Sequence, residues 1–281
     1  MSRSTKIWLI VAASLVVLGI IIFGVVMSML KWDFLKLCTV KYETNSYEID
    51  ESFGNISIKT DTADVTVLPS DDGKVKVVCY ESSKEKHAVS VENDTLIINI
   101  TDSRKWYDYI GIGVGWQKIT VYLPESEYGA LDIKDSTGRI QIDSLYVKSM
   151  SLSVTTGDIK IAEIKCDGDI KIGVSTGKTK MNNVECQNLT SKGSTGNVDM
   201  TGVVAREKLS VKRSTGDIKL DGCDAKELCV ETDTGDVKGS LLTEKVFIVQ
   251  TDTGKKDVPK TTSGGVCEIT TDTGDIIIRI K

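Results

Sequence analysis

Residues 209–237 read LSVKRSTGDIKLDGCDAKELCVETDTGDV and contain two copies of one pattern, in which apolar and polar residues alternate on both sides of a Thr-Gly pair. The same pair recurs through the second half of the chain, each glycine following the previous one by 19 or 20 residues. A spacing held through eight copies indicates an internal structural repeat. The glycines are Gly138, Gly157, Gly177, Gly196, Gly216, Gly235, Gly254 and Gly274.

Apolar residues stand at fixed distances from each glycine. The position two residues after it holds Ile or Val in all copies except those with Thr179 and Lys256, and the position five before it is apolar in all except Ser191. The alternation predicts two short strands per copy, each with one buried face, joined at the Thr-Gly turn. A unit of this size cannot bury its own apolar face, so we expect the copies to stack about 4.8 Å apart as a parallel β-solenoid.

The repeat pattern also divides the chain. Residues 131–281 form the regular repeats, and Ala63 stands in the glycine position of one earlier copy that begins near Phe53. We expect residues 51–130 to be an irregular N-terminal β region and cap, because a solenoid needs atypical terminal units to cover its open core.

An uncharged stretch precedes the β region. Residues 7–30 contain no charged side chain, and about 24 helical residues at ~1.5 Å each cover the ~30 Å hydrocarbon core of a bilayer. Trp8 and Trp32 bracket this stretch, as aromatic residues do at membrane interfaces. A cleaved signal peptide is the alternative, but its apolar region would be shorter and end in small residues. We therefore expect a tail (1–6), a transmembrane helix (7–30) and a juxtamembrane linker (31–50).

The charges bear on location and partners. Lysines and arginines flank both ends of the apolar stretch, so the positive-inside rule does not decide orientation. A short basic tail usually stays in the cytosol, which favours a single-pass protein of the cell membrane with an extracytoplasmic C-terminal domain. Outside residues 1–30 there are 33 basic and 40 acidic residues, a net charge of −7. An acidic body is a poor nucleic-acid binder, and we expect no nucleic-acid partner.

The repeats resemble a known family. The apolar stretch, the opening TDTADVTVLPSDDGKVKV, the strand ITVYLP and the units STGDIKL, DTGDVKG and DTGDIIIRI are similar to the toast-rack domains, bacterial adhesin-like domains of unknown function. The resemblance covers roughly residues 45–281. It implies a right-handed β-solenoid at a bacterial cell envelope, sometimes beside envelope-stress systems. It implies no catalytic residues.

Acidic residues at the Thr-Gly corners are the candidate metal ligands. Asp233, Asp252 and Asp272 occupy the same position in the last three copies, and carboxylates stacked about 5 Å apart could share a hard cation such as Ca²⁺. The competing interpretation is a solvated turn in which each Asp bonds the turn backbone. We favour the turn, because the nonapeptide calcium repeat is absent. We therefore expect no metal and no cofactor.

Aromatic residues concentrate in one long excursion between repeats, which contains Trp106, Tyr107, Tyr109 and Trp116 beside a Gly-rich run. Such rings could contact a glycan, a protein or a membrane surface. The alternative, which we favour, is a lid folded over the open end of the core. Loss of binding or loss of stability on mutation distinguishes the two.

The remaining chemistry argues against an enzyme. The single histidine, His87, excludes any site with two imidazoles, and its charged surroundings predict a surface residue. Seven cysteines include no C-x-x-C pair. Cys166 and Cys186 share a small apolar column, which predicts stacked buried thiols rather than a disulfide. Repeats of constant length leave no insertions to wall a cleft, so we expect no catalytic residues.

The C-terminal strand, residues 275–281, ends the chain without an evident cap. We expect its edge to be exposed and to support self-association. The sequence as a whole favours a non-catalytic, membrane-anchored binding or adhesin-like module of the cell envelope, with a protein or glycan partner. The alternatives are a regulatory component of an envelope-stress response that acts through a membrane partner and, less favoured, a carbohydrate-active β-helix enzyme.

Overall fold

The computed structural model describes residues 2–37, 40–102, 104 and 115–281. The chain divides into two compact units, residues 1–42 with 103–115 and residues 43–102 with 116–281. In its described part the first unit contains helix α1 (Arg3–Met29) and the 3-10 helix η1 (Phe34–Leu37).

Helix α1 begins at the N-cap Ser2, whose hydroxyl accepts a hydrogen bond from Thr5 N at 3.2 Å. Its side chains are exposed almost throughout, although most of them are apolar. Its length and composition would allow it to cross a membrane, and an N-terminal signal sequence would meet the same criteria.

The second unit is built of strands. Their bounds are β1 (Tyr42–Ile49), β2 (Asn55–Thr60), β3 (Ala63–Pro69), β4 (Val75–Ser82), β5 (Glu85–Glu92), β6 (Thr95–Asp102), β7 (Gln117–Leu123), β8 (Glu127–Thr137), β9 (Ile140–Thr156), β10 (Ile159–Cys166), β11 (Asp169–Thr176), β12 (Thr179–Thr195), β13 (Val198–Thr215), β14 (Ile218–Cys223), β15 (Glu227–Thr234), β16 (Val237–Leu241), β17 (Lys245–Thr253), β18 (Lys256–Asp257), β19 (Gly265–Thr273) and β20 (Ile276–Ile280).

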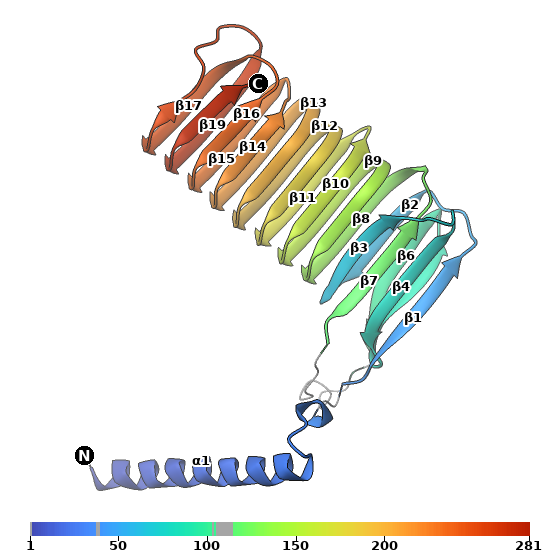
Figure 1. The fold of residues 1–281 in the computed structure, drawn as a ribbon, viewed down its shortest axis with the longest axis vertical. Coiled ribbons are helices and arrows are strands. Elements are labelled where there is room, and N and C mark those ends of the chain that lie inside the picture. The colour runs from blue at the N-terminus through green and yellow to red at the C-terminus, as the bar shows by residue number, and fades with distance from the viewer. Residues whose placement is uncertain (1, 38–39, 103, 105–114) are drawn as a thin grey trace. The chain divides into compact units, whose positions relative to one another are not determined.

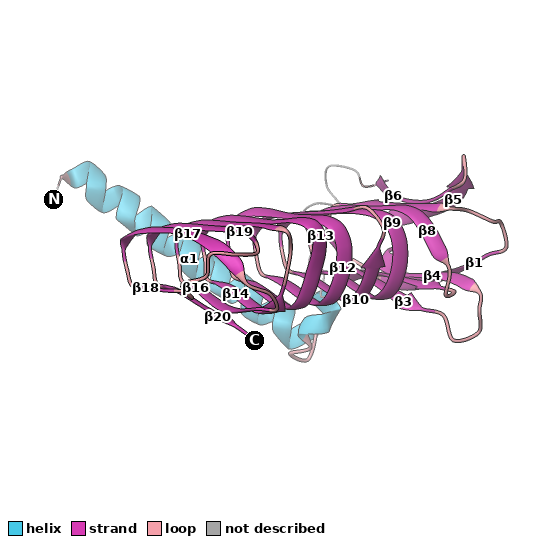
Figure 2. Cartoon of the chain, turned by 90° about the horizontal axis from the view of Figure 1, so that it is seen from above, coloured by secondary structure: helices cyan, strands magenta, loops and turns pink. Residues whose placement is uncertain are grey.

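Equivalent residues of successive copies pair in parallel, and we call each copy a coil. Ile159 of β10 pairs with Ile140 of β9 on one side and with Thr179 of β12 on the other. The members of this column from Ile140 to Ile276 are buried, apart from the outermost Lys256, and the strands lie in two facing layers (Figure 2). The prediction of interior columns is therefore confirmed, and the fold is all-β and solenoid-like. The column continues through Val198, Ile218, Val237 and Ile276.

The Thr-Gly corner requires glycine for steric reasons. Gly177 has a φ of +146°, and a Cβ at this position would lie 1.9 Å from the carbonyl oxygen of Gly157 in the preceding coil. A second corner, which the sequence analysis did not identify, follows six residues after the glycine. Its residues have left-handed backbone conformations but varied side chains: Ser144, Glu163, Asn183, Gly202 and Gly222.

The last coil of the chain does not lie at the end of the stack. Strands β19 and β20 pair with β15 and β16 on one side and with β17 and β18 on the other (Figure 1). Strand β18 covers Ile276 and Ile277, so the expectation of an edge exposed along all of residues 275–281 is wrong, and self-association stays a prediction. Lys256 explains the order: it occupies the column position that Ile276 fills in the last coil. An unpaired ammonium group is costly to bury, so the coil that carries Lys256 lies outermost.

The N-terminal end has a similar order. Strands β2 and β3 pair in parallel with β8 and β9 on one side and with β6 and β7 on the other. Beyond β6 and β7 the pairing becomes antiparallel, since β5 pairs with β6 and β4 with β7. Strand β1 pairs with β4. Because β1 begins at Tyr42, the linker expected over residues 31–50 is shorter than the sequence indicated.

Candidate functional site

The described part of the aromatic excursion places Trp116 in a surface groove. Its side chain is 45% exposed, and its indole Nε1 donates a hydrogen bond to Asp64 Oδ1 at 3.2 Å. The other aromatic residues predicted for partner contact, Trp106, Tyr107 and Tyr109, lie outside the described residues. The groove is lined by Asp64, Trp116, Thr137, Gly138, Arg139, Thr156, Gly157 and Asp158.

Strand pairing positions this groove. Trp116 immediately precedes Gln117, which pairs with Ala63 at the Thr-Gly-type corner of the first coil. Asp64 Oδ1 also accepts a hydrogen bond from Arg139 N at 3.0 Å. One carboxylate therefore connects the indole to the corner of the neighbouring coil, and the groove combines an aromatic ring with hydroxyl, guanidinium and carboxylate groups.

The acidic corner residues Asp233, Asp252 and Asp272 are exposed. Because the last coil is inserted, they stack in the order 233, 272, 252. The aspartates that follow the glycines bond the backbone of neighbouring coils: Asp217 Oδ1 accepts from Asp236 N at 3.0 Å, and Asp236 Oδ1 from Asp275 N at 2.8 Å. These carboxylates stand at a different corner position from Asp233, Asp252 and Asp272, for which the solvated-turn interpretation stays a prediction.

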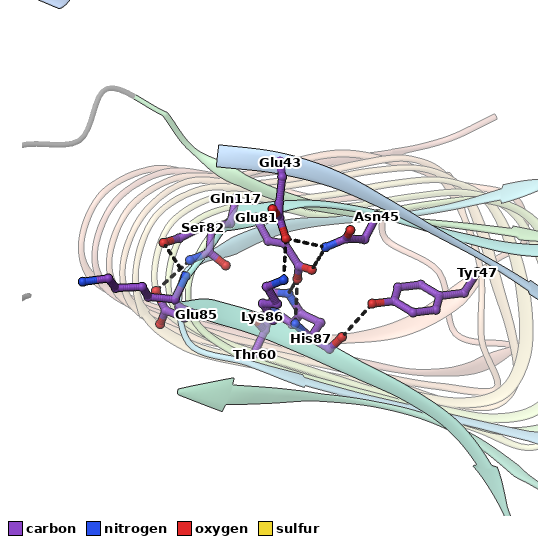
Figure 3. Close-up of polar contacts among 11 residues, drawn as sticks. Glu43, Asn45, Tyr47, Thr60, Glu81, Ser82, Glu85, Lys86, His87 and Gln117 are labelled. Carbon is purple, nitrogen blue, oxygen red and sulfur yellow. Dashed lines mark hydrogen bonds and ion pairs between the residues drawn. The ribbon is translucent and has the colours of Figure 1, made fainter. Parts of the chain in front are cut away.

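His87 is the largest departure from the sequence analysis. We expected a surface residue, but its side chain is buried inside the antiparallel N-terminal region (Figure 3). Its Nδ1 lies 2.8 Å from Glu81 Oε2, and its Nε2 lies 3.0 Å from Thr60 Oγ1. The charged residues next to His87 in the sequence suggested exposure. The sequence did not show that Glu81, six residues earlier, provides a buried carboxylate as its partner.

Glu81 is fully buried and well supplied with donors. Its carboxylate accepts hydrogen bonds from His87 N at 2.6 Å and from Asn45 Nδ2 at 2.7 Å, in addition to its contact with the imidazole. Cys79 lies two residues before Glu81 on β4, and alternation places both side chains on the inner face. Burial, followed by the charge of Glu81, raises the pKa of the Cys79 thiol to about 12.

A second polar cluster interrupts the apolar interior. Arg213 is 1% exposed, and its Nη2 donates to Thr179 Oγ1 at 2.8 Å and to Ser191 Oγ at 3.1 Å. Burial lowers the pKa of the guanidinium to about 10. Thr179 and Ser191 are departures from the two apolar columns, and Gly193 leaves the space that the guanidinium occupies. Residues that break the apolar columns at separate places in the sequence thus meet at one point in the interior.

The thiols are mostly sequestered. Cys79, Cys166, Cys186, Cys223 and Cys267 are buried and free, and Cys229 is half-buried. Cys166 and Cys186 occupy equivalent positions in successive coils. The prediction of stacked buried thiols is confirmed.

Comparison with known proteins places this geometry in a family. A solved structure described as a "putative adhesin" from Bacteroides fragilis NCTC 9343 is 16% identical, with a TM-score of 0.51, over 85% of this chain and 97% of that chain. A "putative lipid binding protein" from Parabacteroides distasonis ATCC 8503 is 13% identical, with a TM-score of 0.41, over 84% and 97%. The first likeness concerns the fold alone. No curated protein matches the chain. Residues 53–168 and 165–281 each match the family model, and the chain therefore belongs to the Toastrack DUF4097 family.

Proposed function

We propose that this protein is a non-catalytic binding module of the cell envelope, anchored by α1 and displaying a rigid β body. The observation that carries the proposal is the half-exposed indole of Trp116 in a groove whose other side chains are polar. A half-exposed aromatic ring next to hydrogen-bonding groups suits a glycan or a protein segment. The interior is filled by buried side chains, most of them apolar, so binding takes place on the outer surface.

In this proposal α1 spans the cell membrane once, and the body is extracytoplasmic. The apolar composition of α1 and the acidic body support the arrangement. The body is a right-handed parallel β-solenoid, as family membership suggests, with an antiparallel region at its N-terminal end.

The buried side chains of Thr60, Glu81 and His87 also favour a non-catalytic role. Thr60, His87 and Glu81 follow the order hydroxyl, imidazole, carboxylate that nucleophilic enzymes use. Thr60 is only 2% exposed, and the two other side chains are buried still more deeply. A nucleophile must reach a substrate, and this hydroxyl is enclosed by the strands around it.

Binding of the full-length chain in detergent to a glycan array and to isolated envelope fractions tests the proposal. We expect Trp116→Ser to lose at least about tenfold in affinity, the loss of roughly 1.4 kcal/mol of contact energy, with an unchanged melting temperature. Ile248→Ser is the matched control, because Ile248 is also exposed but lies on β17 at the far end of the stack.

Three results would contradict the proposal. Equal binding by the wild-type chain and Trp116→Ser would remove the groove from the function. Crosslinks in intact cells that map to α1 and not to the body would indicate the regulatory alternative, in which a membrane partner is contacted. Cleavage of a polysaccharide on the array would indicate an enzyme.

A further inference from the structure

The buried cluster at the N-terminal end brings together three kinds of metal ligand. Cys79 Sγ, a carboxylate oxygen of Glu81 and an imidazole nitrogen of His87 all lie within 4.8 Å of one another. All three side chains are buried. We propose that Cys79, Glu81 and His87 bind a divalent transition-metal ion of the zinc type, which fastens the β4–β5 hairpin.

The donor set selects the class of ion. Calcium and magnesium prefer oxygen ligands only, whereas a set of one sulfur, one nitrogen and one oxygen suits zinc and its neighbours. The charges also match. A thiolate and a carboxylate together carry two negative charges, and they neutralise a divalent cation in an interior that would otherwise disfavour any net charge.

The groups around the three ligands provide the support that metal sites use. A metal-bound histidine usually donates its other N–H to a fixed acceptor, and a ligating carboxylate is itself hydrogen-bonded. Here Thr60 Oγ1 lies 3.0 Å from His87 Nε2, and Asn45 Nδ2 donates to Glu81 Oε1 at 2.7 Å (Figure 3). With the metal on Nδ1, the Nε2 proton has an acceptor already in place.

Binding moves protons in a defined way. The thiol proton of Cys79 leaves to solvent, because only the thiolate is a ligand. The neutral imidazole then carries its proton on Nε2 instead of Nδ1, and the Nε2–H group donates a hydrogen bond to Thr60 Oγ1. The contact between His87 Nδ1 and Glu81 Oε2, now 2.8 Å, opens as both atoms turn to the ion. The positive charge of the ion stabilises the thiolate that burial alone disfavours.

The position of the cluster indicates a structural role. Cys79 and Glu81 belong to β4, and His87 belongs to β5, so the ion would bridge the two strands of the hairpin. Within the described residues these two strands pair only at Ser82 and Glu85, beside the turn. A metal would therefore hold together strands that share few backbone hydrogen bonds.

Cobalt substitution tests the site without any assay of function. The full-length chain in detergent is treated with a chelator, titrated with Co²⁺ and then with Zn²⁺. We expect thiolate-to-cobalt charge-transfer absorption that saturates at about one equivalent and disappears when Zn²⁺ displaces the cobalt. We also expect Zn²⁺ to raise the melting temperature, since it binds only the folded site.

Variants assign the absorption to these residues. Cys79→Ser should abolish the charge-transfer band and the Zn²⁺-dependent rise in melting temperature, whereas Cys229→Ser, which removes the half-buried thiol on β15, should keep both. Asn45→Ala leaves all three ligands in place and should weaken cobalt binding about 10–100-fold. Absence of the band in the wild-type chain, or its persistence in Cys79→Ser, would overturn the proposal. If Cys79→Ser does not fold, unchanged cobalt affinity in Asn45→Ala would also overturn it.

Discussion

The buried carboxyl group of Asp135 should make the protein less stable as the pH rises towards neutrality. Asp135 lies on β8, where it pairs with Thr60 on one side and Val154 on the other, and is 6% exposed. Among the described residues no donor lies in good hydrogen-bond geometry to either carboxyl oxygen. The amides of Thr137 and Ser136 favour the charged form, but burial outweighs them and raises the pKa of Asp135 to about 6.

The size of the effect follows from this pKa. The ordinary value is 3.8, so the native state binds the proton more tightly than the unfolded chain does. Stability from this group is fully present below pH 3.8 and is lost as the pH rises through about 6. At about 1.4 kcal/mol per pKa unit, the ionised carboxylate costs about 3 kcal/mol at neutral pH. Asp135→Asn removes this cost.

Thermal melting of the full-length chain in detergent, followed by circular dichroism, measures the difference. For a body of this size about 3 kcal/mol corresponds to roughly 6–12 °C. We expect Asp135→Asn to melt that much higher than the wild-type chain at about pH 7, and the gap to close towards about pH 4. Asp233→Asn removes an exposed carboxylate at a corner and is the control for loss of charge alone.

Two outcomes would refute the reasoning. A gap between Asp135→Asn and the wild-type chain that does not change with pH would show that ionisation of this group is not its cause. A lower melting temperature for Asp135→Asn at neutral pH would show that the carboxylate has a stabilising partner. Asp135→Val places the same residue type in the column as Val154 and Val174. Its melting temperature should exceed that of the wild-type chain with the same pH dependence as that of Asp135→Asn.

Three further predictions concern the coils. Gly177→Ala should destabilise the body by about 3 kcal/mol or more, because the Cβ would meet a carbonyl oxygen. The control is Gly173→Ala, whose Cβ would lie 3.7 Å from Ser153 Oγ, and it should melt almost as the wild-type chain does. Deletion of residues 275–281 removes the buried Ile276 and Ile278 and should cost about 3–6 kcal/mol by thermal melting; an unchanged melt would mean that this strand lies at an exposed edge. In a Cys38→Ser background an alkylating reagent should modify Cys229 first under native conditions and the other thiols only after unfolding, as mass spectrometry can show.

The local sequence pattern predicts much of the fold. The period-two alternation and the constant glycine spacing specify a coil of two strands, and stacking follows because a single coil cannot bury its apolar face. The second corner was not legible, since Ser144, Glu163 and Asn183 share a backbone conformation and no side-chain type. For the candidate site, the sequence indicated Trp116 but did not indicate its contact with Asp64, which lies 52 residues away.

What the sequence alone determined is therefore the unit and its columns, because each depends on residues that are neighbours along the chain. The order of the coils and the polar clusters were decided only by tertiary structure. Lys256 shows why. Its charge is visible in the sequence, but the sequence does not show that its coil lies outermost and that the last coil lies inside it. That order depends on which coils compete for the interior. His87 likewise changed from an expected surface residue to a buried one because Glu81 and Thr60 meet it across strands, and hydrogen bonds between separate strands leave no local pattern to read.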